Sequence, residues 1–207
     1  MKQNSVLKVL GITGGAGSGK STVSDILEGY GAKIICADRI SKQIMHKDYQ
    51  VYYDILNAFG ETVISPNGEI DRAILGDIVF NDSGKLMILN DITHKHIAKH
   101  IYDEIAAAND VRLYTGIVVD AALPLKNGFI DVVDAIWTVI AHYEYRIGRL
   151  IKRGNYNRDK AIAIIESQMS EQDYIKLADA VIENNDSMDE LRNKVEVLWS
   201  LFLTGSK

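Results

Sequence analysis

The chain has 207 residues, 47% of them hydrophobic and 25% charged, which is the composition of a folded globular protein. A formal net charge of -5 argues against a dedicated nucleic-acid binder, whose affinity would come from a basic surface. The single cysteine, Cys36, cannot form an internal disulfide, and the apolar runs are too short for a signal peptide or a transmembrane helix. We therefore expect a cytoplasmic protein that binds neither nucleic acid nor membranes, as a monomer or a small homo-oligomer.

Strands and helices are expected to alternate from the start of the chain. A short β-branched run at 6–13 predicts a buried strand, and helical spacing follows at 21–30. A second strand is expected at 32–37. Because strand, helix and strand in this order form a right-handed crossover, we expect a parallel sheet.

Helical patterns dominate the middle of the chain, and a turn is expected at 65–68. The expected helices there are 40–59, 72–80 and 85–108. Strands are then expected at 114–121, 133–140 and 181–183, and a last helix at 188–203. A helix from about residue 143 carries Arg146, Arg149 and Arg153, and a polar break at 153–157 separates it from a helix at 158–169.

This order of elements predicts one doubly wound α/β domain over 1–207, with helices on both faces of a parallel sheet. It is a three-layer P-loop NTPase fold with a helical substrate-binding insertion and a short lid. The expected parts are a core of 1–39, 113–142 and 171–207, an insertion at about 40–112 and a lid at about 143–170.

A phosphate loop is the strongest motif. The sequence from Gly14 to Ser21 fits glycine, four residues, glycine, lysine and serine, between a predicted strand and a predicted helix. Glycines let the backbone amides wrap a phosphate, and the helix start adds positive charge. Lys20 is expected to reach the β and γ phosphates of ATP, and the Ser21 hydroxyl to ligate Mg²⁺. The ATP-binding residues are expected to be Gly15, Ala16, Gly17, Ser18, Gly19, Lys20, Ser21 and Thr22.

The remaining signals favour a small-molecule kinase over a GTPase or a motor ATPase. No Asn-Lys-x-Asp motif specifies guanine, and motor ATPases have longer chains. The arginine-bearing helix is expected to clamp the moving phosphoryl group, and the polar break to act as a lid that excludes water. Asp38 follows the second strand, at the sheet edge where such folds bind ligands. Position alone leaves two roles open for it, a catalytic carboxylate or a cap of the next helix.

Over nearly its whole length, the chain resembles the dephospho-coenzyme A kinase family. Ala37-Asp38-Arg39-Ile40 is similar to the family's Asp-Ala-Asp-x-Ile, and Leu89 to His94 to its Leu-Asn-x-Ile-x-His-Pro. Further similar segments are Leu10 to Thr22, Gly68 to Arg72, Arg149 to Arg153 with Ser167-Gln168-Met169, and Ala178 to Asn184.

The resemblance implies that ATP phosphorylates the 3′-hydroxyl of dephospho-coenzyme A, giving coenzyme A and ADP. It implies Asp38 as the base, with Lys20 and Arg149 stabilising the phosphoryl charge. It also places Asn184 near the adenine of ATP. It places three further residues at the acceptor, Arg72, His94 and Asp120. For His94 a second role stays open, that of a partly buried histidine with hydrogen bonds inside the protein. Another hydroxyl acceptor, or a non-catalytic nucleotide- or coenzyme A-binding relative, stays open as an alternative.

Three departures from the family pattern bear on the acceptor. Cys36 replaces the family's first aspartate, and Lys95 its proline after the histidine. The segment 120–126 keeps Asp120 but has Lys126 where the family has an acidic residue.

Overall fold

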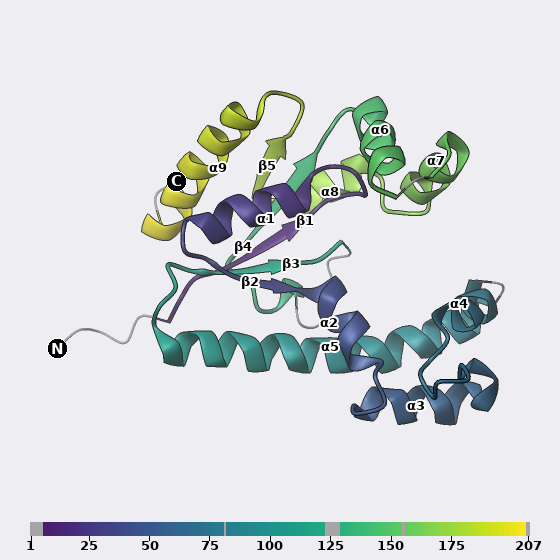
Figure 1. The fold of residues 1–207 in the computed structure, drawn as a ribbon. Helices are drawn as coiled ribbons and strands as arrows, with labels where there is room; N and C mark the ends of the chain where they lie inside the picture. The colour runs from purple at the N-terminus through teal and green to yellow at the C-terminus, as the bar shows by residue number, and fades with distance from the viewer. Residues whose placement is uncertain (1–5, 81, 123–128, 155, 206–207) are drawn as a thin grey trace.

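One parallel sheet organises the computed structural model, which describes residues 6–80, 82–122, 129–154 and 156–205 (Figure 1). Its five strands lie in the order β2-β3-β1-β4-β5. They are β1 (Val9–Thr13), β2 (Lys33–Cys36), β3 (Ile117–Asp120), β4 (Ala135–Ile140) and β5 (Ala180–Glu183). β1 is buried along its whole length, as a central parallel strand covered on both faces must be.

Helices cover both faces of the sheet. Helices α1 (Lys20–Gly29) and α9 (Met188–Thr204) pack on one face, where Leu27, Val195 and Trp199 join the apolar core. Helices α2 (Ala37–Ile44) and α5 (Ser83–Val111) pack on the opposite face (Figure 1). The predicted three-layer α/β fold with a parallel sheet is therefore confirmed.

The helices between β2 and β3 pack along α5. They include α3 (Gln50–Phe59), the short 3-10 helix Glu61–Val63 and α4 (Arg72–Phe80). The predicted turn is confirmed, since the Gly68 amide donates to the Ser65 carbonyl at 2.8 Å. Asp71 begins α4 by accepting hydrogen bonds from the amides of Ala73 and Ile74.

The prediction of one continuous helix over 40–59 is wrong. Helix α2 ends at Ile44 and α3 begins at Gln50. No glycine or proline marks the break, and tertiary contacts set it instead. Tyr49 accepts a hydrogen bond from Gln43 at 2.8 Å, and its ring packs against His100 of α5.

The predicted helix over 158–169 is also too long. Helix α7 (Arg158–Glu166) ends at Glu166, and a separate helix, α8 (Glu171–Leu177), which was not predicted, follows it. The Ser170 hydroxyl accepts a hydrogen bond from the Asp173 amide and so starts α8 as a new helix. Helix α6 (Tyr143–Gly154) begins where expected. Among the described residues, no helix is both long and apolar enough to cross a membrane.

Candidate functional site

The phosphate loop lies at the carboxyl edge of the sheet, between β1 and α1. Parallel register places Ile12 beside Asp120, and Asp120 beside Cys36, so three strands end together there. Gly14, Gly17 and Gly19 have φ values of 137°, 76° and 103°, which only glycine adopts readily. The loop can therefore curl its backbone around an anion at the start of α1.

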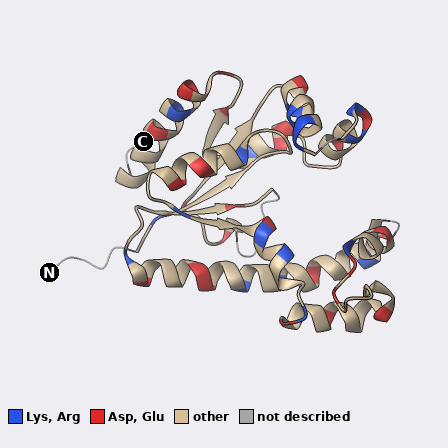
Figure 2. Ribbon diagram, viewed as in Figure 1, with Lys and Arg blue, Asp and Glu red and all other residues tan. Residues whose placement is uncertain are grey.

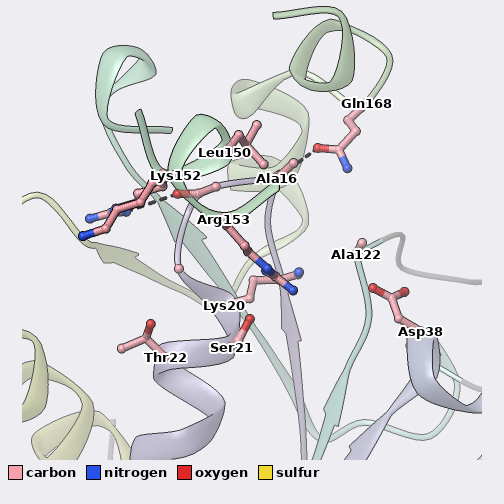
Figure 3. Close-up of a pocket in the computed structure, with 14 residues that line it drawn as sticks. Ala16, Lys20, Ser21, Thr22, Asp38, Ala122, Leu150, Lys152, Arg153 and Gln168 are labelled. Atoms are coloured by element: carbon pink, nitrogen blue, oxygen red, sulfur yellow. Dashed lines mark hydrogen bonds between the residues drawn. The ribbon is translucent and has the colours of Figure 1, made fainter. Parts of the chain in front are cut away.

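A cavity of about 670 Å³ opens over this loop (Figure 3). Its walls come from the loop, from α6 and from the segment after α7. They are formed by Gly15, Ala16, Gly17, Gly19, Lys20, Ser21, Thr22, Asp38, Ala122, Arg149, Leu150, Lys152, Arg153 and Gln168. Seven of the predicted ATP-binding positions of the loop thus line one cavity, and Ser18 is buried beneath them.

A second cavity, of about 260 Å³, lies between α2 and α5. It is lined by Ala37, Asp38, Ser41, Met45, Leu89, Asn90, Thr93, His94, Ile97, Ala121 and Ala122. Asp38 and Ala122 line both cavities, so the two spaces meet at these residues. Two hydrogen bonds to the Ala122 carbonyl fix the junction, one from Tyr174 at 2.9 Å and one from Thr13 at 3.3 Å.

Asp38 lies in the first turn of α2, where its side chain is exposed to both cavities. The helix does not use it as a cap, because Cys36 is the capping position and no side chain caps there. Figure 3 shows the Asp38 carboxylate facing the cavity across from Lys20 and Arg153. This arrangement favours the catalytic reading of Asp38 over the capping one.

Asp120 lies beside the phosphate-loop lysine rather than in the second cavity. Its carboxylate is 3.9 Å from the Lys20 ammonium and accepts a hydrogen bond from the Ser24 hydroxyl at 3.0 Å. Burial raises the pKa of Asp120, while Lys20 and Ser24 oppose that rise. Asp120 therefore lies on the Lys20 side of the site, and its place at the acceptor stays a prediction.

Arg149 and Asn184 hold the phosphate loop from the β5 side. The Arg149 guanidinium donates to the carbonyls of Gly17 and Ser18, at 3.2 and 3.1 Å, and to the Asn184 carbonyl at 2.9 Å. The buried Asn184 side chain donates to the Ser18 carbonyl at 2.8 Å. Asn184 does not line the cavity over the loop, and its described hydrogen bonds join it to Ser18, Arg149 and Ile140.

Arg153 presents its charge directly to the cavity. Its exposed side chain points towards Lys20 (Figure 3), and Lys152 lines the same wall. Basic residues mark α6 at this end of the sheet (Figure 2). Among the described residues, Arg153 has no ion-pair partner that would neutralise it. Its charge is therefore available to bind an anion in the cavity.

Two residues of the inserted helices, His94 and Arg72, were predicted to bind the acceptor, and they lie in different places relative to the two cavities. His94 lines the second cavity, and burial lowers the pKa of its imidazole, opposed by Asp91. Arg72 lines neither cavity, and its guanidinium donates to the Lys42 carbonyl at 2.6 Å. Positions 123–126, where the sequence departs from the family pattern, lie outside the described residues.

Sequence reasoning missed two residues that touch the loop, Arg146 and Gln168. The Arg146 side chain donates to the Ala16 carbonyl at 2.9 Å, and Gln168 accepts from the Ala16 amide at 2.6 Å. A signal for Arg146 was present, since residues 146, 149 and 153 are spaced to share one helix face. Gln168 lies in the Ser167-Gln168-Met169 segment of the family resemblance, but it was not among the predicted site residues.

The site is suited to a magnesium ion that arrives with a nucleotide. The Ser21 side chain lies in the cavity near Lys20 (Figure 3), and the Asp120 carboxylate is 3.9 Å from the Lys20 ammonium. Magnesium in kinases is held by one or two protein oxygens together with substrate phosphates, so a dedicated cage is not needed.

The chain is similar along most of its length to known dephospho-CoA kinases. A family model described as dephospho-CoA kinase matches residues 8–190. A dephospho-CoA kinase of Carboxydothermus hydrogenoformans is 40% identical over 190 residues, which cover 92% of each chain. The solved dephospho-CoA kinase of Campylobacter jejuni is 25% identical and covers 95% of this chain and 98% of its own, with a TM-score of 0.69. A solved structure from Thermus thermophilus has the same fold, at 24% identity, with a TM-score of 0.80 and coverage of 95% and 98%.

Proposed function

Because the chain belongs to the dephospho-CoA kinase family, which catalyses the ATP-dependent last step of coenzyme A biosynthesis, we propose that Asp38 is the base of this reaction. The observation that carries the proposal is the shared boundary of the two cavities. Asp38 lines both the space over the phosphate loop and the space between α2 and α5. A ribose hydroxyl in the second space would therefore meet Asp38 and the terminal phosphate of ATP together.

Asp38 would accept the proton of the 3′-hydroxyl as that oxygen attacks the γ-phosphorus. The bond from the γ-phosphorus to the bridging oxygen breaks, and ADP leaves. Transfer is direct, because positioning and charge stabilisation supply most of the catalysis in phosphoryl transfer. No covalent enzyme intermediate is needed.

Three cations of the first cavity would stabilise the transferred group. Lys20 lies at the start of α1, and Asp120 holds it at 3.9 Å. Arg149 donates hydrogen bonds to the loop carbonyls of Gly17 and Ser18. We propose that it also faces the phosphates from the cavity wall. Arg153 supplies a further charge to the same space.

Ser21 and Asp120 would hold Mg²⁺ with the phosphates of ATP. The ion would supply positive charge to the β and γ oxygens. Asn184 would act beside them by keeping the Ser18 carbonyl, and hence the loop, in place for ATP.

The second cavity would hold the adenosine end of the acceptor. Among the residues that the structure describes, no lysine or arginine lines it, so an uncharged base and ribose suit it better than a diphosphate. His94 and Asn90 offer hydrogen bonds there. Arg72 stays a proposal for the charged remainder of the acceptor, since it is exposed on α4.

Residues 40–112 would form the acceptor-binding insertion of a single kinase domain, and residues 143–170 the lid. We place the reaction in the cytoplasm, in keeping with a chain whose one cysteine cannot form an internal disulfide. Its partners would be ATP and dephospho-coenzyme A, in a monomer or a small homo-oligomer.

The test is ADP release with ATP, Mg²⁺ and dephospho-coenzyme A, for wild type and Asp38→Asn. Loss of a general base should lower kcat by about 100-fold or more, while ATP binding stays within about twofold. Asp48→Asn is a matched control, since Asp48 is exposed, lines neither cavity and should leave kcat unchanged.

A wild-type enzyme that releases no ADP with dephospho-coenzyme A would refute the proposed acceptor. A panel of nucleosides and other small hydroxyl compounds would then identify a different acceptor. Background turnover with every compound would instead support a non-catalytic nucleotide-binding protein.

A further inference from the structure

The amide and the carbonyl of one phosphate-loop residue, Ala16, are both held by side chains of the lid region. The Ala16 amide donates to Gln168 Oε1 at 2.6 Å, and the Ala16 carbonyl accepts from Arg146 Nε at 2.9 Å. Arg146 belongs to α6, and Gln168 follows α7. Two elements more than 120 positions away in the sequence thus meet on a single residue of the loop.

Glycines in the loop make this approach possible. A Cβ at Gly15 would overlap the Arg146 guanidinium and lie 3.4 Å from Gln168 Oε1. A Cβ at Gly17 would lie 2.6 Å from the Arg146 carbonyl oxygen. The loop and α6 are therefore in close contact, and any movement of Arg146 must shift the loop.

Arg146 is a buried cation without a buried anion to match it. It is 8% exposed, and within the part of the chain that the structure describes it forms no ion pair, although the charge of the exposed Glu171 carboxylate acts on it. It lies behind the loop rather than in the cavity wall. A buried charge of this kind is costly unless another group compensates it, and the anion that binds this loop has the opposite sign.

We propose that Arg146 and Gln168 are positioning residues that hold Ala16 of the loop between them, and that Arg146 adds a fixed positive charge behind the loop for the polyphosphate of ATP. Gln168 fixes the amide, and Arg146 fixes the carbonyl. The lid region thereby sets the shape of the phosphate loop before ATP arrives. This proposal rests on the proposed function only through ATP binding, not through the identity of the acceptor.

Direct ATP binding by calorimetry tests the proposal on the full chain, beside steady-state kinetics. Gln168→Met removes the acceptor oxygen at similar size, and should raise the ATP Kd roughly tenfold, as expected for one lost hydrogen bond. Arg146→Met should raise it further, because a hydrogen bond and a charge are both lost. The KM for dephospho-coenzyme A, and kcat at saturating ATP, should change by less than about threefold.

Two readouts separate positioning from a general loss of structure. Arg146→Met removes an unmatched buried charge, so its Tm should equal or exceed that of wild type even though ATP binds more weakly. Its loss of affinity should also be larger for ATP than for AMP, because a charge acts on the phosphates. Arg146→Lys keeps the charge and should show an intermediate loss.

Arg158→Met is the matched control. Arg158 of α7 pairs with Glu144 of α6 at 2.7 and 2.9 Å, on the surface and away from the loop. Losing this link between the same two helices should leave the ATP Kd within about twofold. The double variant Arg146→Met, Gln168→Met should lose less affinity than the product of the single losses, since both act on one residue.

An ATP Kd within twofold of wild type in both folded single variants would overturn the proposal. So would equal losses for ATP and AMP, or an equal rise in the KM of both substrates. If wild type fails to phosphorylate dephospho-coenzyme A, the proposed function is wrong. The ATP-binding measurements still test the roles of Arg146 and Gln168, so the failure of one proposal can be told from the failure of the other.

Discussion

Gly19 lies where the phosphate loop turns into α1, at a φ of 103° that side chains rarely adopt. A Cβ there would collide with the Asn184 amide, the group that donates to the Ser18 carbonyl. A residue with a side chain at position 19 would therefore have a strained backbone and would also collide with Asn184, and glycine avoids both.

Gly19→Ala should weaken ATP binding by about tenfold or more, because strain of about 1–3 kcal/mol falls on the loop itself. Calorimetric titration with ATP checks this value. Gly29→Ala is the control, since a Cβ at Gly29 of the same helix meets nothing within 4 Å and needs no positive φ. Equal affinities for the two variants would contradict the argument.

His94 is expected to bind the acceptor in its neutral form. Burial lowers the pKa of its imidazole, so the folded protein resists protonation below the ordinary value of about 6.5. The unfolded chain takes up the proton first as the pH falls, and stability therefore decreases from about pH 6.5 downward.

Two measurements follow for His94→Gln, which keeps hydrogen-bonding capacity without a titrating group. Between pH 7 and pH 5, the unfolding free energy of the variant should fall by less than that of wild type. Urea titration measures both values. Its KM for dephospho-coenzyme A should also vary less over that range than that of wild type. Identical pH profiles for both proteins would contradict a role for His94 titration.

At the scale of elements, α9 is fixed to the sheet by aromatic packing. Trp199 stacks on Phe202, meets Trp137 edge to face, and fills the space beside Gly116, where a Cβ would lie 2.7 Å away. It is only 4% exposed. Trp199 therefore packs α9 against the sheet beside the glycine that precedes β3, together with the buried Leu191 and Val195.

Trp199→Ala should lower the unfolding free energy by about 3–5 kcal/mol, the usual effect of emptying an aromatic core position. Leu201→Ala, two residues along the same helix, should lower it by less than about 1 kcal/mol, because Leu201 is 39% exposed. Denaturant unfolding of both variants makes the comparison. A similar loss in both would mean that α9 is not held mainly by its buried face.

Element boundaries show where sequence patterns lose information. Helix α4 was predicted at its observed bounds, because Asp71 caps it locally. The break between α2 and α3 was missed, because it depends on Tyr49 packing against α5, far along the chain. Helix α8 was missed although Ser170 and Asp173 give a local start signal, which a capping rule could have used.

At the scale of the whole molecule, ATP would connect the sheet edge, α1 and the lid region through one cavity. The lining residues come from the segments 15–22, 38, 122, 149–153 and 168. A ligand that touches so many separate segments should stabilise the entire fold, because it binds the native state and not the unfolded chain.

ATP with Mg²⁺ at 100 times its Kd should add about 2.7 kcal/mol of stability. For a chain of this size, that corresponds to a rise in Tm of roughly 5–11 °C, measurable by thermal scanning. Adenosine at the same concentration should give a much smaller shift, and Lys20→Met should lose most of the shift with ATP. A full shift in Lys20→Met would place ATP elsewhere.

The sequence alone determined the phosphate loop, the alternation of strands and helices, and the position of Asp38 at the sheet edge. These features are local, since a turn of glycines between a strand and a helix is specified by adjacent residues. The reaction class followed from several short motifs in the right order.

Only the tertiary structure decided which side chains act together. It placed Asp120 against Lys20, left Arg72 outside both cavities, and brought Arg146 and Gln168 to Ala16. It also made Asp38 the boundary of two spaces. The reason is physical: these contacts join residues tens of positions apart, and they depend on strand register and on helix packing angles, which no short stretch of sequence specifies.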